Sequence, residues 1–131
     1  MPHTSISAAD SHDTLYRMRV FQLASALVPD SFDDAKLLST EPIMETIARQ
    51  LYAAVCSIEA NLSEGYSRSS GKDRARLFEY ALGSVRESMS WYNSSRPILG
   101  EETTVDRRDR LEEMRRLLLA IIPRERGRKM N

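Results

Sequence analysis

The residues of this chain that are best suited to bind a ligand are its clustered basic side chains, and the ligand they suit is phosphate. Guanidinium and ammonium groups hold phosphate oxygens by charge and hydrogen bonds, so a cluster of them indicates a polyanion site. One cluster follows residue 66 and another lies at the C-terminus. The expected nucleic-acid-binding residues are Arg68, Lys72, Arg74, Arg76, Arg124, Arg126, Arg128 and Lys129. The alternative is that these cations are solvated and pair with nearby carboxylates.

Charge is unevenly distributed along the chain. The 19 basic and 19 acidic residues give a net charge of zero. Residues 1–64 carry nine acidic and four basic side chains, and residues 65–131 carry ten and fifteen. Proteins that bind polyanions over their whole surface are usually basic overall, so we expect any anion site here to be regional. Alternatively, the two halves attract each other within one chain or between subunits.

Catalytic and metal-binding residues are not expected. His3 and His12 fall in or beside a loose N-terminus, which cannot hold a base in fixed geometry. Cys56 lies among alanines without a nearby histidine and is interpreted as a buried structural thiol. A di-metal carboxylate bundle needs Glu-x-x-His pairs, and no glycine-rich phosphate loop or GxSxG elbow occurs. We therefore expect a non-enzymatic protein without metal or cofactor.

Composition bounds the class of protein. A chain of 131 residues with five glycines, five prolines and 29% charged residues is typical of one helical domain with an aliphatic core. The single cysteine excludes an intrachain disulfide and is consistent with a reducing cytoplasm. No apolar run is long enough to span a membrane, and the N-terminus lacks a secretory signal pattern. A cytoplasmic protein without membrane contact is expected.

Apolar residues recur at steps of three and four in four segments, which is the spacing of one helix face. The segments run from residue 13 or 14 to 28, from 41 to 66, from about 71 to Pro97, and from about 103 to 123. The predicted fold is all-α, an antiparallel up-down four-helix bundle, because the links are short. The predicted domains are a disordered tail over 1–12, the bundle over 13–123 and a basic tail over 124–131.

Helix ends are predicted from capping residues and prolines. Thr40 and Ser70 are expected N-caps, as is Thr103 for the last helix. Pro123 is expected to end that last helix. Pro29 interrupts the first pattern, and Ser31 with Asp34 could cap a short piece through residue 38. Whether residues 31–38 extend the first helix or fold back separately stays open from the sequence.

A set of polar, glycine and apolar positions resembles a known family, the four-helix-bundle proteins encoded in intervening sequences of bacterial 23S ribosomal RNA genes. The matching residues are Gln50, Ser57, Ile58, Asn61, Glu64, Gly65, Arg68, Ala81, Gly83, Ser84 and Glu87. The resemblance is close over 50–89 and extends to the flanking helices only by pattern. It implies an antiparallel bundle and a ring-like homopentamer. A distant branch, the accessory variability proteins of diversity-generating retroelements, adds binding to nucleic acid or reverse transcriptase.

The polar members of this motif, Asn61, Glu64 and Arg68, have two interpretations. They could contact a ligand or RNA, or they could tie the end of the second helix to the third through hydrogen bonds. We favour the structural interpretation, under which Glu64→Ala lowers the melting temperature sharply.

Four residues of the third helix lie on one face, at steps of four and three, beside its apolar face: Ser84, Ser88, Trp91 and Ser95. This second face predicts an oligomer interface. A large apolar ring in a row of serines would be left in water on an isolated bundle.

Helix order brings the two basic clusters together. In an antiparallel bundle the second helix ends, the third begins and the fourth ends at the same pole. The leading hypothesis is therefore a homo-oligomeric bundle that binds nucleic acid (RNA or RNA/DNA), or a nucleoprotein partner such as a reverse transcriptase, through one basic pole. The alternative is a protein-docking scaffold or regulator without nucleic-acid contact, and a cryptic enzyme or metal bundle is the third hypothesis. No base-reading module is present, so sequence-specific recognition is not expected.

Overall fold

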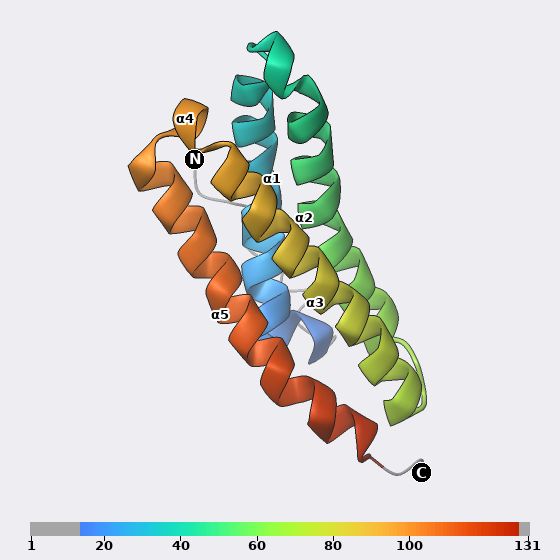
Figure 1. Cartoon of the computed structure of the whole chain (residues 1–131). Helices are drawn as coiled ribbons and strands as arrows, with labels where there is room; N and C mark the ends of the chain where they lie inside the picture. The colour runs from blue at the N-terminus through green and yellow to red at the C-terminus, as the bar shows by residue number, and fades with distance from the viewer. Residues whose placement is uncertain (1–13, 129–131) are drawn as a thin grey trace.

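The computed structural model describes residues 14–128, and this range is helical with short links and no strand (Figure 1). The long helices are α1 (Arg19–Leu38), α2 (Glu45–Tyr66), α3 (Gly71–Ser94) and α5 (Glu101–Arg126). The short elements are η2 (Thr14–Arg17), η3 (Pro42–Met44) and α4 (Arg96–Leu99). The all-α prediction is confirmed. The predicted tail over 1–12 and Lys129 lie outside the described residues.

Each long helix packs against the next one along the chain, and α5 also contacts α1, though less extensively (Figure 1). The second half of α1 lies beside the first half of α5, where Asp34 pairs with Arg107. The start of α3 lies beside the end of α5, where Arg74 pairs with Glu125. Within the described residues, none of these helices is both long and apolar enough to cross a bilayer.

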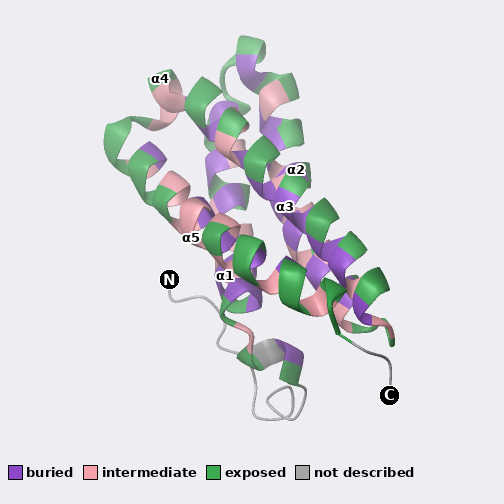
Figure 2. Ribbon diagram, turned by 60° about the horizontal axis from the view of Figure 1, so that its bottom comes forward, coloured by how far each residue is buried: buried purple, intermediate pink, exposed green. Residues whose placement is uncertain are grey.

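The core is formed by the inward faces of the four long helices, as the buried positions in Figure 2 show. Its large side chains include Val20, Leu27, Leu51, Ile58, Leu62, Phe78, Val85, Tyr92, Leu111, Met114 and Leu118. Most of the predicted apolar positions are buried, whereas Ile47, Met89 and Ile121 are half-buried. Burying one such side chain contributes about 1.5–3 kcal/mol, against about 0–1 kcal/mol for a surface ion pair. The apolar faces therefore determine which sides of the helices meet.

Helix α1 continues through Pro29, so residues 31–38 extend the first helix. Proline removes one backbone hydrogen bond, but packing of the apolar face on both sides of it keeps the helix together. Of the two alternatives that the sequence left open, a separate piece capped by Ser31 is excluded, because the Ser31 hydroxyl donates to the Val28 carbonyl at 2.7 Å.

The predicted cap at Thr40 is also wrong. The Thr40 hydroxyl donates to the Leu37 carbonyl at 2.7 Å, which satisfies the end of α1 instead of the start of α2. Pro42 opens a 3₁₀ turn, and α2 proper begins at Glu45. The predicted end of α2 at residue 66 is confirmed, as is the Ser70 cap, whose hydroxyl accepts from the Asp73 amide at 3.1 Å.

Helix α5 begins earlier and ends later than predicted. It begins at Glu101, directly after Gly100, whose φ of 86° favours glycine. Thr103 is therefore inside the helix and not its cap. Pro123 lies within α5, which runs on to Arg126, so the first three residues of the predicted tail are helical.

Candidate nucleic-acid interface

The turn between α2 and α3 meets the end of α5 at one end of the molecule, which we call the basic pole and define as residues 64–79 and 121–128 (Figure 1). Gly71 makes this approach possible. A Cβ atom at that position would lie 2.1 Å from the Glu125 carbonyl oxygen and 2.8 Å from Arg128 Cβ. For the described residues, the predicted meeting of the two basic clusters is confirmed.

Glu125 lies between two arginines of the basic pole. Arg74 Nε is 3.2 Å from Glu125 Oε2, and these side chains are 18% and 14% exposed. The Arg74 guanidinium also lies 4.8 Å from the centroid of the Tyr66 ring, a cation–π distance. Arg128 Nη1 approaches Glu125 Oε1 at 3.3 Å from the solvent side. Arg74 therefore has a structural role that joins α2, α3 and α5.

Two further cations of the pole hold carboxylates in exposed pairs. Arg126 Nη2 lies 2.7 Å from Glu79 Oε1, and Arg68 Nη2 lies 2.7 Å from Glu64 Oε1. All four side chains are between 45% and 55% exposed, so water screens both pairs. Exposed pairs contribute about 0–1 kcal/mol, and a phosphate can therefore displace the carboxylate at little cost.

Lys72, Arg76 and Arg124 are exposed and form no salt bridge with the part of the chain that the structure describes. Arg76 donates to the Tyr80 hydroxyl at 3.4 Å, and this hydrogen bond raises the pKa of the Arg76 guanidinium. Seven described cations of the pole face four carboxylates, those of Glu64, Asp73, Glu79 and Glu125. The pole thus keeps an excess of positive charge in a chain of zero net charge.

A groove of about 650 Å³ opens at this pole between the starts of α1 and α3 and the ends of α2 and α5. Its walls are Met18, Tyr66, Arg74, Ile121, Arg124, Glu125 and Arg128. Three arginines against one glutamate make its polar wall attractive to anions.

The predicted polar cluster of Asn61, Glu64 and Arg68 is split. Asn61 Nδ2 donates to the Ser57 carbonyl and hydroxyl at 2.9 and 3.0 Å, and Ser57 Oγ accepts from Ser84 Oγ at 3.0 Å. Asn61 therefore links α2 to α3 through Ser57, as the structural interpretation predicted. Glu64 is exposed and pairs with Arg68 one turn along, so for Glu64 that interpretation is wrong.

Gly65 has a role that the sequence did not reveal. It lies inside the last turn of α2, where α2 and α3 are in close contact. A Cβ atom at this position would lie 2.8 Å from Phe78 Cε1 and 3.1 Å from Leu77 Cβ. Phe78 is fully buried and has no space to retreat. Gly65 is therefore a packing residue.

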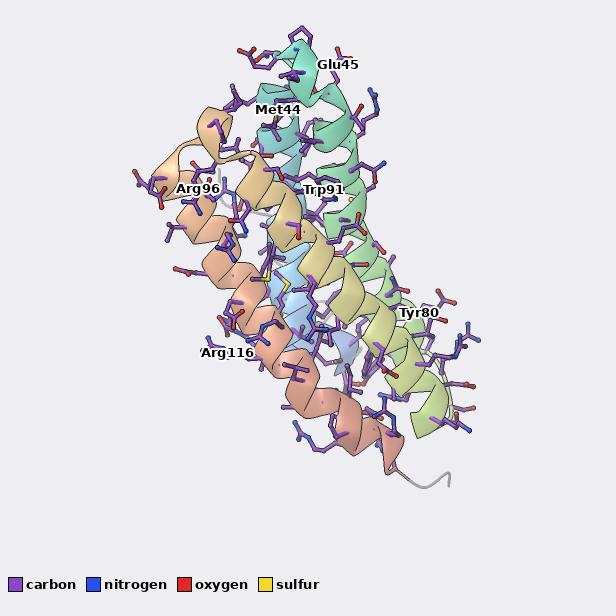
Figure 3. All side chains as sticks on the ribbon, in the orientation of Figure 1. Met44, Glu45, Tyr80, Trp91, Arg96 and Arg116 are labelled. Carbon is purple, nitrogen blue, oxygen red and sulfur yellow. The ribbon has the colours of Figure 1, made fainter. Side chains whose placement is uncertain are left out.

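The serine line of α3 is mostly internal. Ser88 and Ser95 are fully buried and donate to the carbonyls of Ser84 and Trp91 in their own helix. Trp91 is half-buried and donates from Nε1 to Glu87 at 3.0 Å (Figure 3). Ser88 and Ser95 are therefore not part of the surface of one chain. The expected oligomer interface stays a prediction that depends on Ser84 and Trp91.

A buried charged network between α1, α3 and α5 was missed. Asp34 Oδ2 accepts from the Tyr92 hydroxyl at 2.6 Å and from Arg107 Nε at 2.8 Å. Burial, and then the hydrogen bond to Asp34, raise the pKa of Tyr92 well above its ordinary value. Arg110 extends the network to Asp30 at 2.7 Å. The available signal was the position of Asp34 on the apolar face of α1, since a buried carboxylate needs a buried partner.

Cys56 is half-buried, so the expectation of a fully buried thiol is corrected. A hydrogen bond with Cys56 raises the pKa of the Tyr52 hydroxyl. Among residues 14–128, no three or more His, Cys, Asp or Glu side chains are arranged to hold a metal ion. His3 and His12 lie outside that range.

Comparisons with known proteins give a family and a fold. A family model described as 23S rRNA-intervening sequence protein matches residues 16–120. A solved structure of a protein with unknown function from the S23 ribosomal protein family of Bacteroides thetaiotaomicron is similar, with a TM-score of 0.74 and 21% identity over 79% of this chain and 97% of that one. No curated protein matches. Arg124, Arg126 and Arg128 lie beyond the range that the family model matches.

Proposed function

Because the chain belongs to the 23S rRNA-intervening sequence protein family, we propose that it is a non-enzymatic, homo-oligomeric bundle that binds nucleic acid through the basic pole. RNA or an RNA/DNA hybrid, free or held by a nucleoprotein such as a reverse transcriptase, is the proposed partner. The four long helices form the antiparallel up-down bundle in this proposal, and the protein acts in the cytoplasm.

The observation that carries the proposal is the meeting of two basic segments, about fifty residues apart in the chain, around one open groove. Lys72, Arg76 and Arg124 supply charge that no described carboxylate neutralises. Arg68 and Arg126 supply charge that only exposed carboxylates hold. A phosphate backbone presents a series of negative charges that can engage several of these cations at once.

Binding in this mode is expected to be independent of sequence. Arginine and lysine contacts to phosphate position a nucleic acid but do not read its bases. The apolar residues Met18 and Ile121 in the groove add a surface on which an unpaired nucleotide can lie. Strong salt dependence and little sequence preference follow.

The alternative is a scaffold that docks another protein at this pole without touching nucleic acid. The paired arginines favour it, because Glu125 already neutralises part of the groove. An acidic protein surface would use the same cations, and the two functions therefore need a direct test.

The test compares two double variants with equal loss of charge. Lys72→Gln with Arg124→Gln removes two free cations of the pole, and Arg86→Gln with Arg116→Gln removes two exposed cations elsewhere, of which Arg116 is labelled in Figure 3. Fluorescence anisotropy with a labelled single-stranded RNA is measured across salt concentrations. The pole variant should lower the slope of log affinity against log salt by about 1.4, since each lost phosphate contact removes about 0.7.

The control double variant should retain the wild-type slope. A flat salt dependence for the wild-type protein, or an equal change in both variants, would contradict phosphate binding at the pole. It would then favour the protein-docking alternative.

A further inference from the structure

Exposed apolar side chains gather at the end of the molecule opposite the basic pole, around the turn from α1 to α2 (Figure 1). Ile43 in η3 is 86% exposed, and Phe32 and Leu37 of α1 are each 49% exposed. Single exposed apolar residues are ordinary, but three occur here within twelve residues of chain. We call this region the apolar end and define it as residues 32–52.

A groove of about 330 Å³ runs between α1 and α2 at the apolar end. Its lining consists of Phe32, Ala35, Lys36, Ser39, Ala48, Arg49 and Tyr52. The Phe32 and Tyr52 rings meet edge to face, with their centroids 5.7 Å apart. Lys36 on α1 and Arg49 on α2 contribute a cation from each side, and neither forms a salt bridge with a described residue.

Ile43 has the complementary chemistry. It is the most exposed large apolar residue of the described chain, and Glu41 and Glu45 flank it, both exposed (Figure 3 labels Glu45). Neither glutamate forms a salt bridge with residues 14–128. Since Ile43 is almost fully in water, it does not fill the groove of its own chain. The same end of the molecule therefore carries an acidic apolar projection and a basic apolar groove.

We propose that Ile43 of one copy inserts into the α1–α2 groove of a second copy, with Glu41 and Glu45 facing Lys36 and Arg49. The groove is large enough to take an isoleucine side chain, and its charge is opposite to that of the residues beside Ile43. Because every copy carries both the projection and the groove, the contact can repeat head to tail from one copy to the next around a ring.

This inference rests on the homo-oligomeric part of the proposed function and names an interface for it. It differs from the interface predicted at Ser84 and Trp91, which lie on α3. It does not depend on phosphate binding, because the apolar end shares no residue with the basic pole.

The first experiment is light scattering of the full-length protein over a range of concentrations, with Ile43→Asp compared with Leu119→Asp. Leu119 on α5 is a matched control, since it is 42% exposed and lies outside the apolar end. Ile43→Asp should weaken association at least ten-fold, because it removes the inserted side chain, whereas Leu119→Asp should associate like the wild type. Far-ultraviolet circular dichroism verifies that both variants are folded.

The second experiment separates the two halves of the contact. Ile43→Asp retains the groove, and Phe32→Asp retains the projection but places a charge in the groove. Neither variant should associate alone. In an equimolar mixture, Ile43 of the Phe32→Asp variant can insert into the intact groove of the Ile43→Asp variant, so a complex should form. A mixture that stays monomeric overturns the proposal.

The outcomes distinguish this inference from the proposed function. A wild-type protein that stays monomeric at all concentrations overturns the inference together with homo-oligomer formation. An oligomer whose mass Ile43→Asp leaves unchanged overturns the inference alone. If the wild-type protein binds no RNA but associates in a way that Ile43→Asp abolishes, phosphate binding is overturned and the inference stands.

Discussion

The α2–α3 and α1–α5 interfaces join neighbouring long helices by different means. At the α2–α3 interface the Phe78 ring packs directly against Gly65, where there is no room for a side chain. The Ser84 hydroxyl also donates to the Ser57 hydroxyl across this interface. At the α1–α5 interface charged pairs span the gap, with Arg19 to Glu113 at 3.0 Å and Arg107 to Asp34 at 2.8 Å. The first interface should therefore be sensitive to volume, and the second to the loss of a charge and to pH.

The largest effect is expected at the α1–α5 interface from Asp34→Ala. This change leaves the buried Tyr92 hydroxyl without its acceptor and removes one carboxylate from Arg107. Breaking a buried pair costs about 3–5 kcal/mol. Because Arg107 keeps its hydrogen bond to Asp106 in this variant, the expected loss of unfolding free energy is near the low end, at about 3 kcal/mol. Urea unfolding measures it.

The half-exposed Asp106 is the control for this variant, because Asp106→Ala should cost less than about 1 kcal/mol. If Asp34→Ala lowered the unfolding free energy no more than Asp106→Ala does, a dominant contribution of Asp34 to the network would be contradicted.

At the α2–α3 interface Gly65→Ala should lower the unfolding free energy by about 1–3 kcal/mol, the usual cost of overpacking. The added methyl group would lie 2.8 Å from a buried ring. Gly83→Ala is the matched control on α3, where a Cβ atom meets nothing within 4 Å. It should stabilise the protein by up to about 1 kcal/mol through helix propensity. Thermal unfolding distinguishes the two, and a stabilising Gly65→Ala would contradict the close approach.

Alkaline pH should lower the unfolding free energy through Tyr92 of α3, whose hydroxyl donates to Asp34 at the α1–α5 interface. Burial and the hydrogen bond to Asp34 raise the pKa of Tyr92, so the folded protein keeps that proton above pH 10 while the unfolded chain loses it. This contribution is complete below pH 10 and falls by about 1.4 kcal/mol per pH unit above it. Urea unfolding at pH 8 and pH 10.5 measures the loss, which should be smaller in Tyr92→Phe. An identical pH dependence in that variant would contradict the assignment.

The smallest effect is expected from Glu64→Ala, which touches neither interface. Its exposed pair with Arg68 contributes about 0–1 kcal/mol, so the melting temperature should change little. Asn61→Ala should cost more, because Asn61 holds the Ser57 hydroxyl that meets Ser84. A larger loss from Glu64→Ala than from Asn61→Ala would reverse this ranking and restore the interpretation drawn from the sequence.

Periodicity was sufficient to locate the long helices, because each apolar face repeats over several turns. Local chemistry also predicted the Ser70 cap, whose partner lies three residues away. The position of the basic pole followed from helix order and short links. These features depend on residues that are close in sequence or on the connection between whole helices.

The missed features depend on residues that are distant in sequence. Gly65 and Gly71 are required by Phe78 and by the Glu125 backbone, which only the packed molecule brings near. Pro29 and Pro123 do not end their helices, because tertiary packing outweighs the loss of one hydrogen bond. From the sequence Asp34 resembles a capping residue, because its partners Tyr92 and Arg107 are far away in the chain.

The groove at the basic pole is lined by segments that are distant in the chain, and this has a consequence during synthesis. Arg74 and Arg124 are made about fifty residues apart, and at 5–20 residues per second the ribosome needs roughly 3–10 s to add the second after the first. Until then the nascent chain has the Gly71 contact surface but not the α5 segment that docks on it. The groove is therefore assembled late in translation, and no nascent chain presents it complete before the end of α5 has been made.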